Sequence, residues 1–252
     1  MLETEALLFI AFAMFSAGLV KGLVGLGLPV ISLGLMMLAI DLKQAIIIVL
    51  VPLLITNLWQ GLVGGHMLFI IKRIWLMLST GAIAIWLTVG FMLTVNTAIL
   101  SIALGTILYC YGAYGLMNPQ IRLPERTEIV FSPLAGTISG VIAGLTGSLS
   151  IPAVFYLHAL EMSRHVLIQA MGIWFCLGSI ILSAALDYHN ALPMELSIIS
   201  AGATGPALVG MELGRRMRHG LSEKLFQNLF FCILIMLGSY ISLRNLVKFS
   251  TL

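Results

Sequence analysis

Four side chains inside long apolar runs of this chain are of types that can bind an anion. Lys21 lies in the first run, and Thr146, Ser148 and Ser150 lie in a later one. A lysine at membrane depth is costly and often functional, so Lys21 can attract a negative charge there. Hydroxyl groups can donate hydrogen bonds to an oxyanion without adding a full charge. The plainer alternatives are that Lys21 extends to an interface and that the hydroxyls bond to preceding carbonyls of their own helix.

These residues belong to two copies of one glycine-rich motif. Residues 16–30 read SAGLVKGLVGLGLPV, and residues 139–154 read SGVIAGLTGSLSIPAV. With a constant offset of 122 residues, Gly18, Gly22 and Gly25 match Gly140, Gly144 and Gly147, and Pro29 matches Pro152 after one inserted residue. A proline after clustered glycines removes a backbone donor and favours the start of a new helix. Each copy therefore predicts an interrupted helix whose unbonded N–H groups and positive dipole end point into the break.

Glycines spaced four residues apart also have a simpler use, because they let helices pack closely in lipid. That explanation is sufficient for the first two glycines of each copy. It does not account for the later glycines and the proline, where the interrupted backbone must find partners in protein or in a water-filled cavity.

Three amide side chains are further candidates for the site. Asn57 and Gln60 are three residues apart, so they share one helix face, and Gln169 lies in a later apolar segment. They form either a wall of the site or hydrogen bonds between helices. The full set of predicted substrate-binding residues is Lys21, Gly22, Gly25, Gly27, Pro29, Asn57, Gln60, Gly144, Thr146, Gly147, Ser148, Ser150, Pro152 and Gln169.

No catalytic residue, metal ligand or cofactor is expected. The sequence contains no HExxH, GxSxG or GxxxxGK[ST] pattern, and Cys110, Cys176 and Cys232 are isolated in apolar segments. The net charge of +3 is spread over the loops beside those segments. It reports orientation in a membrane rather than nucleic-acid binding, so no nucleic-acid partner is expected.

The composition places both motifs in a lipid bilayer. Hydrophobic residues make up 60% of the chain and charged residues 9%, with a mean hydropathy of +1.09. A soluble domain has about 45–50% apolar and about 25% charged residues. The predicted fold class is therefore an all-α integral membrane protein.

Eight apolar segments fall into two related halves, 1–117 and 129–252, joined by a polar linker at 118–128. The first segment of each half is long and broken, and three ordinary spans follow it. The first half contains Ala6–Ile40 (broken around Gly25–Pro29), Gln44–Val63, Ile74–Val95 and Ala98–Met117. The second half contains Ile129–Leu160 (broken around Gly147–Pro152), Val166–Leu186, Leu196–Gly214 and Leu225–Val247. The first segment, as one straight helix, would be about 52 Å long against a hydrocarbon core of about 30 Å, so it tilts or folds back as a hairpin.

The charged loops favour the hairpin. If each broken segment crosses the membrane once, the loop lysines and arginines divide evenly between the two faces. If each broken segment is a hairpin, one face holds Lys72, Arg73, Arg122, Arg126, Arg164, Arg215, Arg216, Arg218 and Lys224, against Lys43, Arg244 and Lys248 on the other. The second division obeys the positive-inside rule and puts both termini outside. The two halves then have opposite orientations and form an inverted repeat.

The chain resembles the TauE/SafE family of bacterial membrane transporters, also called the 4-toluene sulfonate uptake permease family. The resemblance rests on GLVGLGLPV and GLTGSLSIPAV, the eight apolar segments, the TNLWQ stretch at 56–60 and a length near 250 residues. It implies a transporter of small organosulfur or oxyanion compounds, such as sulfite or sulfonates, in the bacterial inner membrane. The second motif carries serines where the first has glycine or leucine, which makes the two breaks chemically unequal.

The expected function is that of a multi-pass secondary transporter in which the two broken segments meet near the midplane and expose an anion site alternately to each face. The alternatives are an anion channel and a transporter of another small carboxylate or oxyanion, and a membrane-bound enzyme is third. H⁺ and Na⁺ are the candidate coupling ions, although no well-centred Asp or Glu pair is present to serve as a proton relay.

Overall fold

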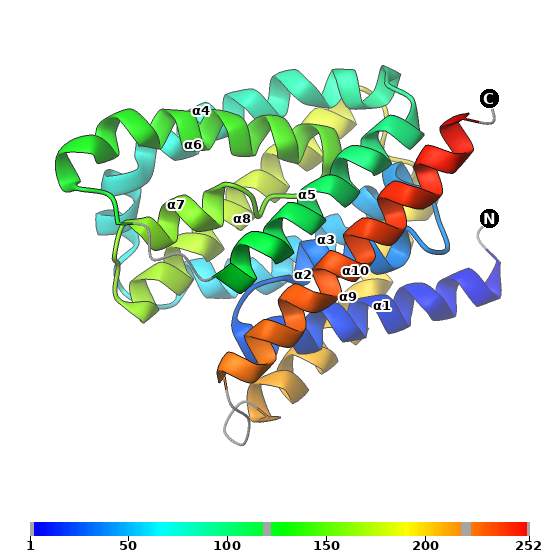
Figure 1. Ribbon diagram of the computed structural model, residues 1–252, viewed down its shortest axis with the longest axis horizontal. Coiled ribbons are helices and arrows are strands. Elements are labelled where there is room, and N and C mark those ends of the chain that lie inside the picture. The colour runs from blue at the N-terminus through cyan, green and yellow to red at the C-terminus, as the bar shows by residue number, and fades with distance from the viewer. Residues whose placement is uncertain (1–2, 118–121, 218–222, 251–252) are drawn as a thin grey trace. The chain divides into compact units, whose positions relative to one another are not determined.

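The computed structural model describes residues 3–117, 122–217 and 223–250, except for the side chains of 223–226 and 248–250. These residues form helices joined by short connections, and no strand occurs among them (Figure 1). Part of the predicted linker, 118–121, lies outside the described residues. So does Arg218, and the side chains of Lys224 and Lys248 are not described either.

The helices follow the predicted segments closely. Their bounds are α1 (Thr4–Val24), α2 (Leu28–Met36), α3 (Leu42–Leu62), α4 (Met67–Thr94), α5 (Thr97–Met117), α6 (Glu125–Thr146), α7 (Ala153–Ala159), α8 (Arg164–Tyr188), α9 (Met194–Met217) and α10 (Glu223–Ser250). Of the described helices, eight are long and apolar enough to cross a membrane. The short helices α2 and α7 complete the two broken segments. The prediction of an all-helical membrane fold with eight apolar segments is confirmed.

Two predicted boundaries are wrong. The third segment was expected to begin at Ile74, but α4 begins at Met67 and continues across a non-helical residue, Ile74, with φ −112° and ψ 16°. Lys72 and Arg73 therefore lie in a helix rather than in a loop. Helix α6 begins at Glu125, inside the predicted linker, because Pro124 precedes it and two glutamates in its first turn favour a helix N-terminus.

The described residues divide into two compact units. Unit 1 contains residues 1–52, 95–119 and 193–252, and unit 2 contains residues 53–94 and 120–192. Each unit thus combines helices from both halves of the sequence. That the two halves are related as inverted repeats stays a prediction.

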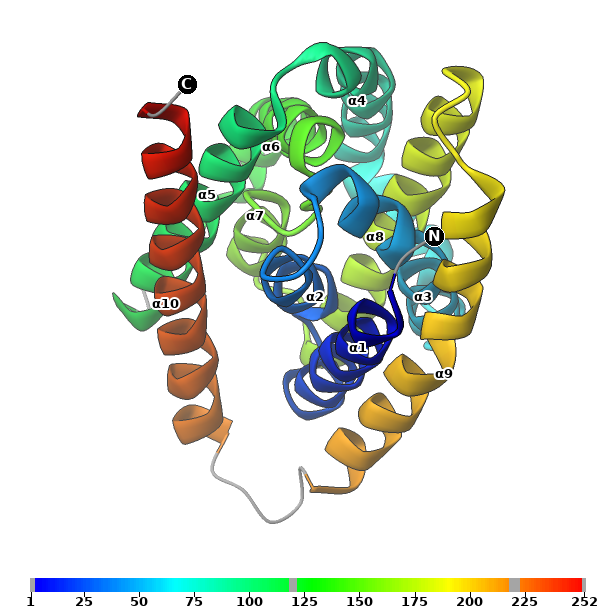
Figure 2. The same cartoon turned by 90° about the vertical axis from the view of Figure 1, so that its right-hand side faces the viewer.

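In unit 1, α1 packs against α9 through glycines on both helices. A Cβ added at Gly18 would meet the backbone carbonyl of Ala207, and one added at Gly210 would meet that of Phe15. Helices α5 and α10 lie side by side in the same way, with Gly105 against the carbonyl of Gly238 (Figure 2). Such contacts leave no room for a side chain, so these helices approach backbone to backbone.

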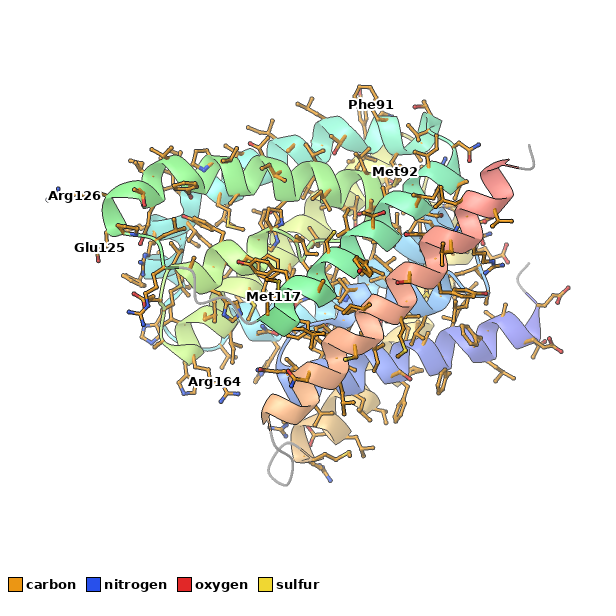
Figure 3. The ribbon with its side chains drawn as sticks, in the orientation of Figure 1. Phe91, Met92, Met117, Glu125, Arg126 and Arg164 are labelled. Atoms are coloured by element: carbon orange, nitrogen blue, oxygen red, sulfur yellow. The ribbon has the colours of Figure 1, made fainter. Side chains whose placement is uncertain are left out.

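In unit 2, α4 packs against α6 by the same principle. Added Cβ atoms at Gly136 and Gly140 would meet the carbonyls of Met77 and Gly81, which lie on α4. The packing explanation offered for the first two glycines of each motif therefore holds. The opposite side of α4 is apolar and exposed: Phe91 points outward and is 64% exposed, whereas the adjacent Met92 is buried (Figure 3). This is the pattern expected of a lipid-facing helix.

Both broken segments return to the side from which they start. In unit 1, one cavity of about 450 Å³ is lined by Glu3, just before α1, and by Met37 and Asp41, just after α2. In unit 2, the backbone N–H of Leu123, before α6, donates to the carbonyl of Ala159, at the end of α7, over 3.0 Å. Each broken segment is a hairpin. Their orientation in a membrane, with the termini outside, stays a prediction.

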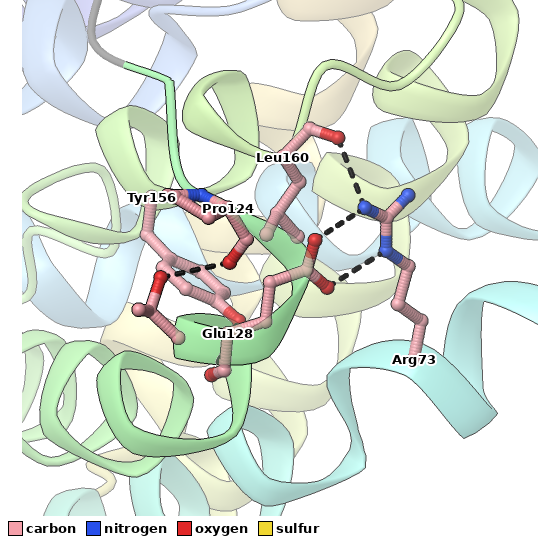
Figure 4. Close-up of polar contacts among 6 residues, drawn as sticks. Arg73, Pro124, Glu128, Tyr156 and Leu160 are labelled. Carbon is pink, nitrogen blue, oxygen red and sulfur yellow. Dashed lines mark hydrogen bonds and ion pairs between the residues drawn. The ribbon is translucent and has the colours of Figure 1, made fainter.

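The base of the second hairpin is fastened to α4 by an arginine. Arg73 Nε and Nη2 donate to the two carboxylate oxygens of Glu128 over 3.0 and 2.6 Å, and Nη2 also donates to the carbonyl of Leu160 over 3.1 Å (Figure 4). The side chains of Arg73 and Glu128 are only 24% and 13% exposed. A bidentate, charge-assisted pair of this kind fixes the geometry of both partners. It therefore holds the start of α6 and the end of α7 against α4.

Candidate functional site

The first break lies between α1 and α2 and is made by two glycines with left-handed backbone. Gly25 has φ 90°, and its N–H donates to the carbonyl of Lys21 over 2.7 Å, which ends α1. Gly27 has φ 103° and precedes α2, in which Pro29 occupies the first turn. Positive φ values of this size are strained for residues with a Cβ, so both positions favour glycine. The predicted helix interruption is confirmed.

The second break, between α6 and α7, begins with the same glycine turn as the first break. Gly147 has φ 73°, and its N–H donates to the carbonyl of Ala143 over 2.8 Å, which ends α6. The break then continues to Pro152, and α7 starts at Ala153. Gly25 and Gly147 thus occupy equivalent places, but the second break is longer by several residues. We call residues 25–27 the first tip and residues 147–152 the second tip.

Lys21 is buried in the last turn of α1, in unit 1. The residue is only 5% exposed, so protein encloses it and it does not extend to an exposed interface. The next residue, Gly22, has a packing role: an added Cβ there would meet the backbone carbonyl of Met211 on α9. In unit 2, Gly144 packs in a similar way against Thr88 of α4.

The three hydroxyls of the second motif differ in their hydrogen bonding. Thr146 Oγ1 donates to the carbonyl of Ile142 over 2.7 Å, as the plainer alternative predicts for a hydroxyl in a helix. Ser148 and Ser150 are 0% and 1% exposed, and among the described residues neither hydroxyl has a hydrogen-bond partner. The plainer alternative therefore fails for these two serines. Each is a buried donor with no acceptor, which costs free energy unless something else binds there.

The second tip is anchored on α8 between these serines. The indole N–H of Trp174 donates to the carbonyl of Leu149 over 2.7 Å, and an added Cβ at Gly178 would meet the Leu149 side chain. Trp174 is fully buried, and an added Cβ at Gly81 of α4 would meet its ring. This positioning role was not predicted, because a tryptophan in an apolar segment carries no motif. The anchor fixes Leu149 and, through the backbone, the positions of both serines.

The amide candidates on α3 and α8 are used in bonds between and within helices. Gln60 Nε2 donates to the carbonyl of Ile168 over 2.8 Å, and Gln169 Nε2 donates to that of Gly61 over 3.0 Å. Asn57 Nδ2 donates to the carbonyl of Leu53, four residues earlier, over 2.8 Å. The two glutamine bonds agree with the alternative in which the amides join helices, whereas the Asn57 bond lies within α3. A contact of any of the three with substrate stays a prediction.

The predicted site residues thus fall into two groups, each within its own unit. Unit 1 holds Lys21, Gly22, Gly25, Gly27 and Pro29. The others lie in unit 2, in the segment 144–152 and on the unit-2 parts of α3 and α8. That the two tips face each other stays a prediction. The described residues contain no group of three or more His, Cys, Asp or Glu side chains that could hold a metal ion.

Comparison with known proteins gives one match. No curated protein sequence and no solved structure matches the chain. A family model described as sulfite exporter TauE/SafE matches residues 10–241. The matched region includes both breaks, the buried lysine and the anchored serine tip. Because it covers nearly the whole chain, this multi-pass membrane protein belongs to the sulfite exporter TauE/SafE family.

Proposed function

We propose that the protein is a secondary transporter that moves a small sulfur oxyanion or organosulfonate, with sulfite as the first candidate, across the bacterial inner membrane by alternating access. The family supports transport of a sulfite-type anion. The observation that carries the proposed site is the pair of buried serine hydroxyls, Ser148 and Ser150, which lack partners among the described residues.

The energetics of a buried hydroxyl favour a ligand at this tip. An unsatisfied buried donor costs about 1–3 kcal/mol, and a hydrogen bond to a charged group contributes about 1.5–3 kcal/mol. Sulfite and sulfonate groups present several acceptor oxygens and no large apolar surface. Binding such a group satisfies both hydroxyls at once, and the anchor at Trp174 keeps them in place when the site is empty.

Lys21 supplies the charge in this proposal. A buried ammonium group paired with an anion offsets part of the cost of taking both charges out of water. The first tip adds backbone donors, since the N-terminal turn of α2 has N–H groups outside the helical hydrogen-bond pattern. In this proposal each hairpin offers its own donors: the second has hydroxyls, and the first has a lysine and backbone N–H groups.

Flux measurements on purified protein in liposomes test the proposal. A carrier shows saturable uptake of labelled sulfite that is accelerated by unlabelled sulfite inside the vesicles. A channel, the main alternative, gives large currents without saturation and without this counterflow. Counterflow with a small carboxylate but not with sulfite would show that the substrate is another anion. Imposing H⁺ or Na⁺ gradients separately identifies the coupling ion.

A matched set of serine variants tests the site itself. Ser148→Ala and Ser150→Ala should abolish or strongly weaken sulfite counterflow. Ser139→Ala is the control, because Ser139 is equally buried in α6 but its hydroxyl already donates to the carbonyl of Ala135 over 2.6 Å. Normal transport by the first two variants would remove the second tip from the site.

A further inference from the structure

Helix α3 passes from one compact unit to the other without interruption. The chain changes unit after Pro52, Thr94, Pro119 and Leu192. The second and fourth of these positions fall between helices, and the third falls within 118–121, outside the described residues. Only the first falls inside a described helix. If the units move as rigid bodies, α3 must absorb the movement next to Pro52.

Pro52 leaves a gap in the backbone hydrogen bonds of α3. Proline has no N–H, so the carbonyl of Ile48, four residues earlier, loses its usual helical partner. Ile48 is fully buried, and lipid offers no substitute partner. A buried carbonyl left in this state would destabilise the helix.

A serine from α9 fills that gap. Ser200 Oγ donates to the carbonyl of Ile48 over 2.8 Å and accepts from the N–H of Val51 over 3.2 Å. Ser200 is 1% exposed, so water does not provide these bonds from the surface. All of these residues, with Pro52, belong to unit 1. One hydroxyl thus replaces the helical bond that Pro52 cannot make.

The first turn of α3 beyond Pro52 also uses side-chain bonds. The carbonyl of Leu53, the first residue of unit 2, accepts from Asn57 Nδ2 over 2.8 Å and from Thr56 Oγ1 over 3.4 Å. Side-chain donors can rotate and follow a carbonyl as the backbone changes direction, whereas a helical N–H is fixed to its own turn. The helix is therefore bonded on both sides of Pro52 by groups that tolerate bending.

We propose that Pro52 is the hinge about which the two units move during transport, and that Ser200 is the positioning residue that keeps the hinge bonded while it bends. The proposal rests on the alternating-access function proposed above. It adds to that function the place where the movement is absorbed. Hinges in other proteins are likewise a few residues that take up backbone change between rigid parts.

A thermodynamic cycle tests the bonding part of the hinge without any transport measurement. Ser200→Ala should lower the melting temperature of the purified protein, because the carbonyl of Ile48 loses its donor. In a Pro52→Ala background, residue 52 has an N–H for that carbonyl, so the same serine change should lower the melting temperature much less. Equal decreases in the two backgrounds would show that Ser200 does not serve the proline gap, and would overturn the proposal.

Spin labels test the movement. After replacement of the native cysteines, one pair is placed on Leu243 and Tyr188, which are exposed residues of units 1 and 2. The control pair, on Leu68 and Tyr188, lies within unit 2. The cross-unit pair should give two distance populations whose ratio changes with sulfite, and Pro52→Ala should reduce them to one. The control pair should keep a single distance throughout. Two unchanged populations in Pro52→Ala would refute the hinge.

Transport and binding assays separate failure of the hinge from failure of the proposed function. Pro52→Ala should slow sulfite counterflow by about tenfold or more, which corresponds to about 1.4 kcal/mol in the barrier. It should leave the sulfite-induced rise in melting temperature unchanged, because the hinge touches no substrate. Absence of sulfite counterflow in the unmodified protein counts against the function, whereas wild-type rates in Pro52→Ala count against the hinge.

Discussion

Replacing the two serines of the second tip with alanine should stabilise the empty protein and weaken its binding of sulfite. Ser148 and Ser150 are buried, and their hydroxyls have no partner among the described residues. Each hydroxyl therefore costs folding free energy when no ligand is present. The double variant Ser148→Ala/Ser150→Ala removes both costs, each about 1–3 kcal/mol, and should raise the free energy of unfolding of the empty protein by about 2–6 kcal/mol.

The same change should reduce affinity for the anion. A hydrogen bond to a charged group contributes about 1.5–3 kcal/mol, and each 1.4 kcal/mol is tenfold in the dissociation constant. Loss of one hydroxyl thus corresponds to about a 10- to 150-fold weaker Kd. Higher stability combined with weaker binding distinguishes a ligand-binding serine from a structural one.

Thermal unfolding in detergent with a sulfite titration measures both quantities, since a bound ligand raises apparent stability by mass action. The control variant Ser139→Ala loses the bond from Oγ to the carbonyl of Ala135. It should cost no more than about 1.5 kcal/mol and leave the sulfite response unchanged. The reasoning is refuted if the double variant is less stable than the parent and responds to sulfite as strongly as before.

Three further predictions concern packing and topology. Arg73→Gln leaves the largely buried carboxylate of Glu128 without its cation and should lower stability by about 1–3 kcal/mol in thermal unfolding. The exposed Arg215→Gln, as control, should leave the melting temperature close to that of the parent. Gly18→Ala should reduce stability or expression because its Cβ would meet the α9 backbone, whereas Gly202→Ala, which has open space, should be neutral or slightly stabilising in the same assay. Tags at both termini should be accessible from outside intact cells, and a tag reached only after permeabilisation would contradict the proposed topology.

Much of the fold could be predicted from the chain because a bilayer imposes strong rules on it. Apolar runs of about 20 residues identify the spans, and glycines followed by proline identified both breaks. The charge distribution was sufficient to favour hairpins. The kink at Ile74 could not be predicted, since neither glycine nor proline marks it.

Which helix of one half packs against which helix of the other half also could not be predicted from the sequence. Gly18 and Gly140 clearly belong to close-packing patterns, but such a pattern does not name its partner helix. In the structure, Gly18 packs against α9 and Gly140 packs against α4.

The candidate site was predicted less completely than the fold. The motif pointed to Ser148 and Ser150, and the structure shows that they differ from Thr146, whose hydroxyl bonds within its own helix. That difference depends on where α6 ends. The sequence TGSLS at 146–150 does not show that the helix ends at Thr146. Gln60 and Gln169 have the right chemistry for a site, but their amide groups bond to backbone carbonyls of neighbouring helices. Only three-dimensional contacts separate these two uses of the same side chain.

The pairing of α1 with α9 has a consequence for how the protein is made. Gly18 meets Ala207, about 190 residues later in the chain, and a ribosome working at 5–20 residues per second needs about 10–40 seconds to cover that distance. Helix α4 waits much less for α6, because Gly81 meets Gly140, only 59 residues later in the chain. Unit 2 can therefore fold while α1, which carries Lys21, is in the membrane and α9 has not yet been synthesised. A chain released or stalled before α9 would have a complete second unit and an incomplete first one, in which the glycine face of α1 stays exposed to lipid and to quality-control proteases.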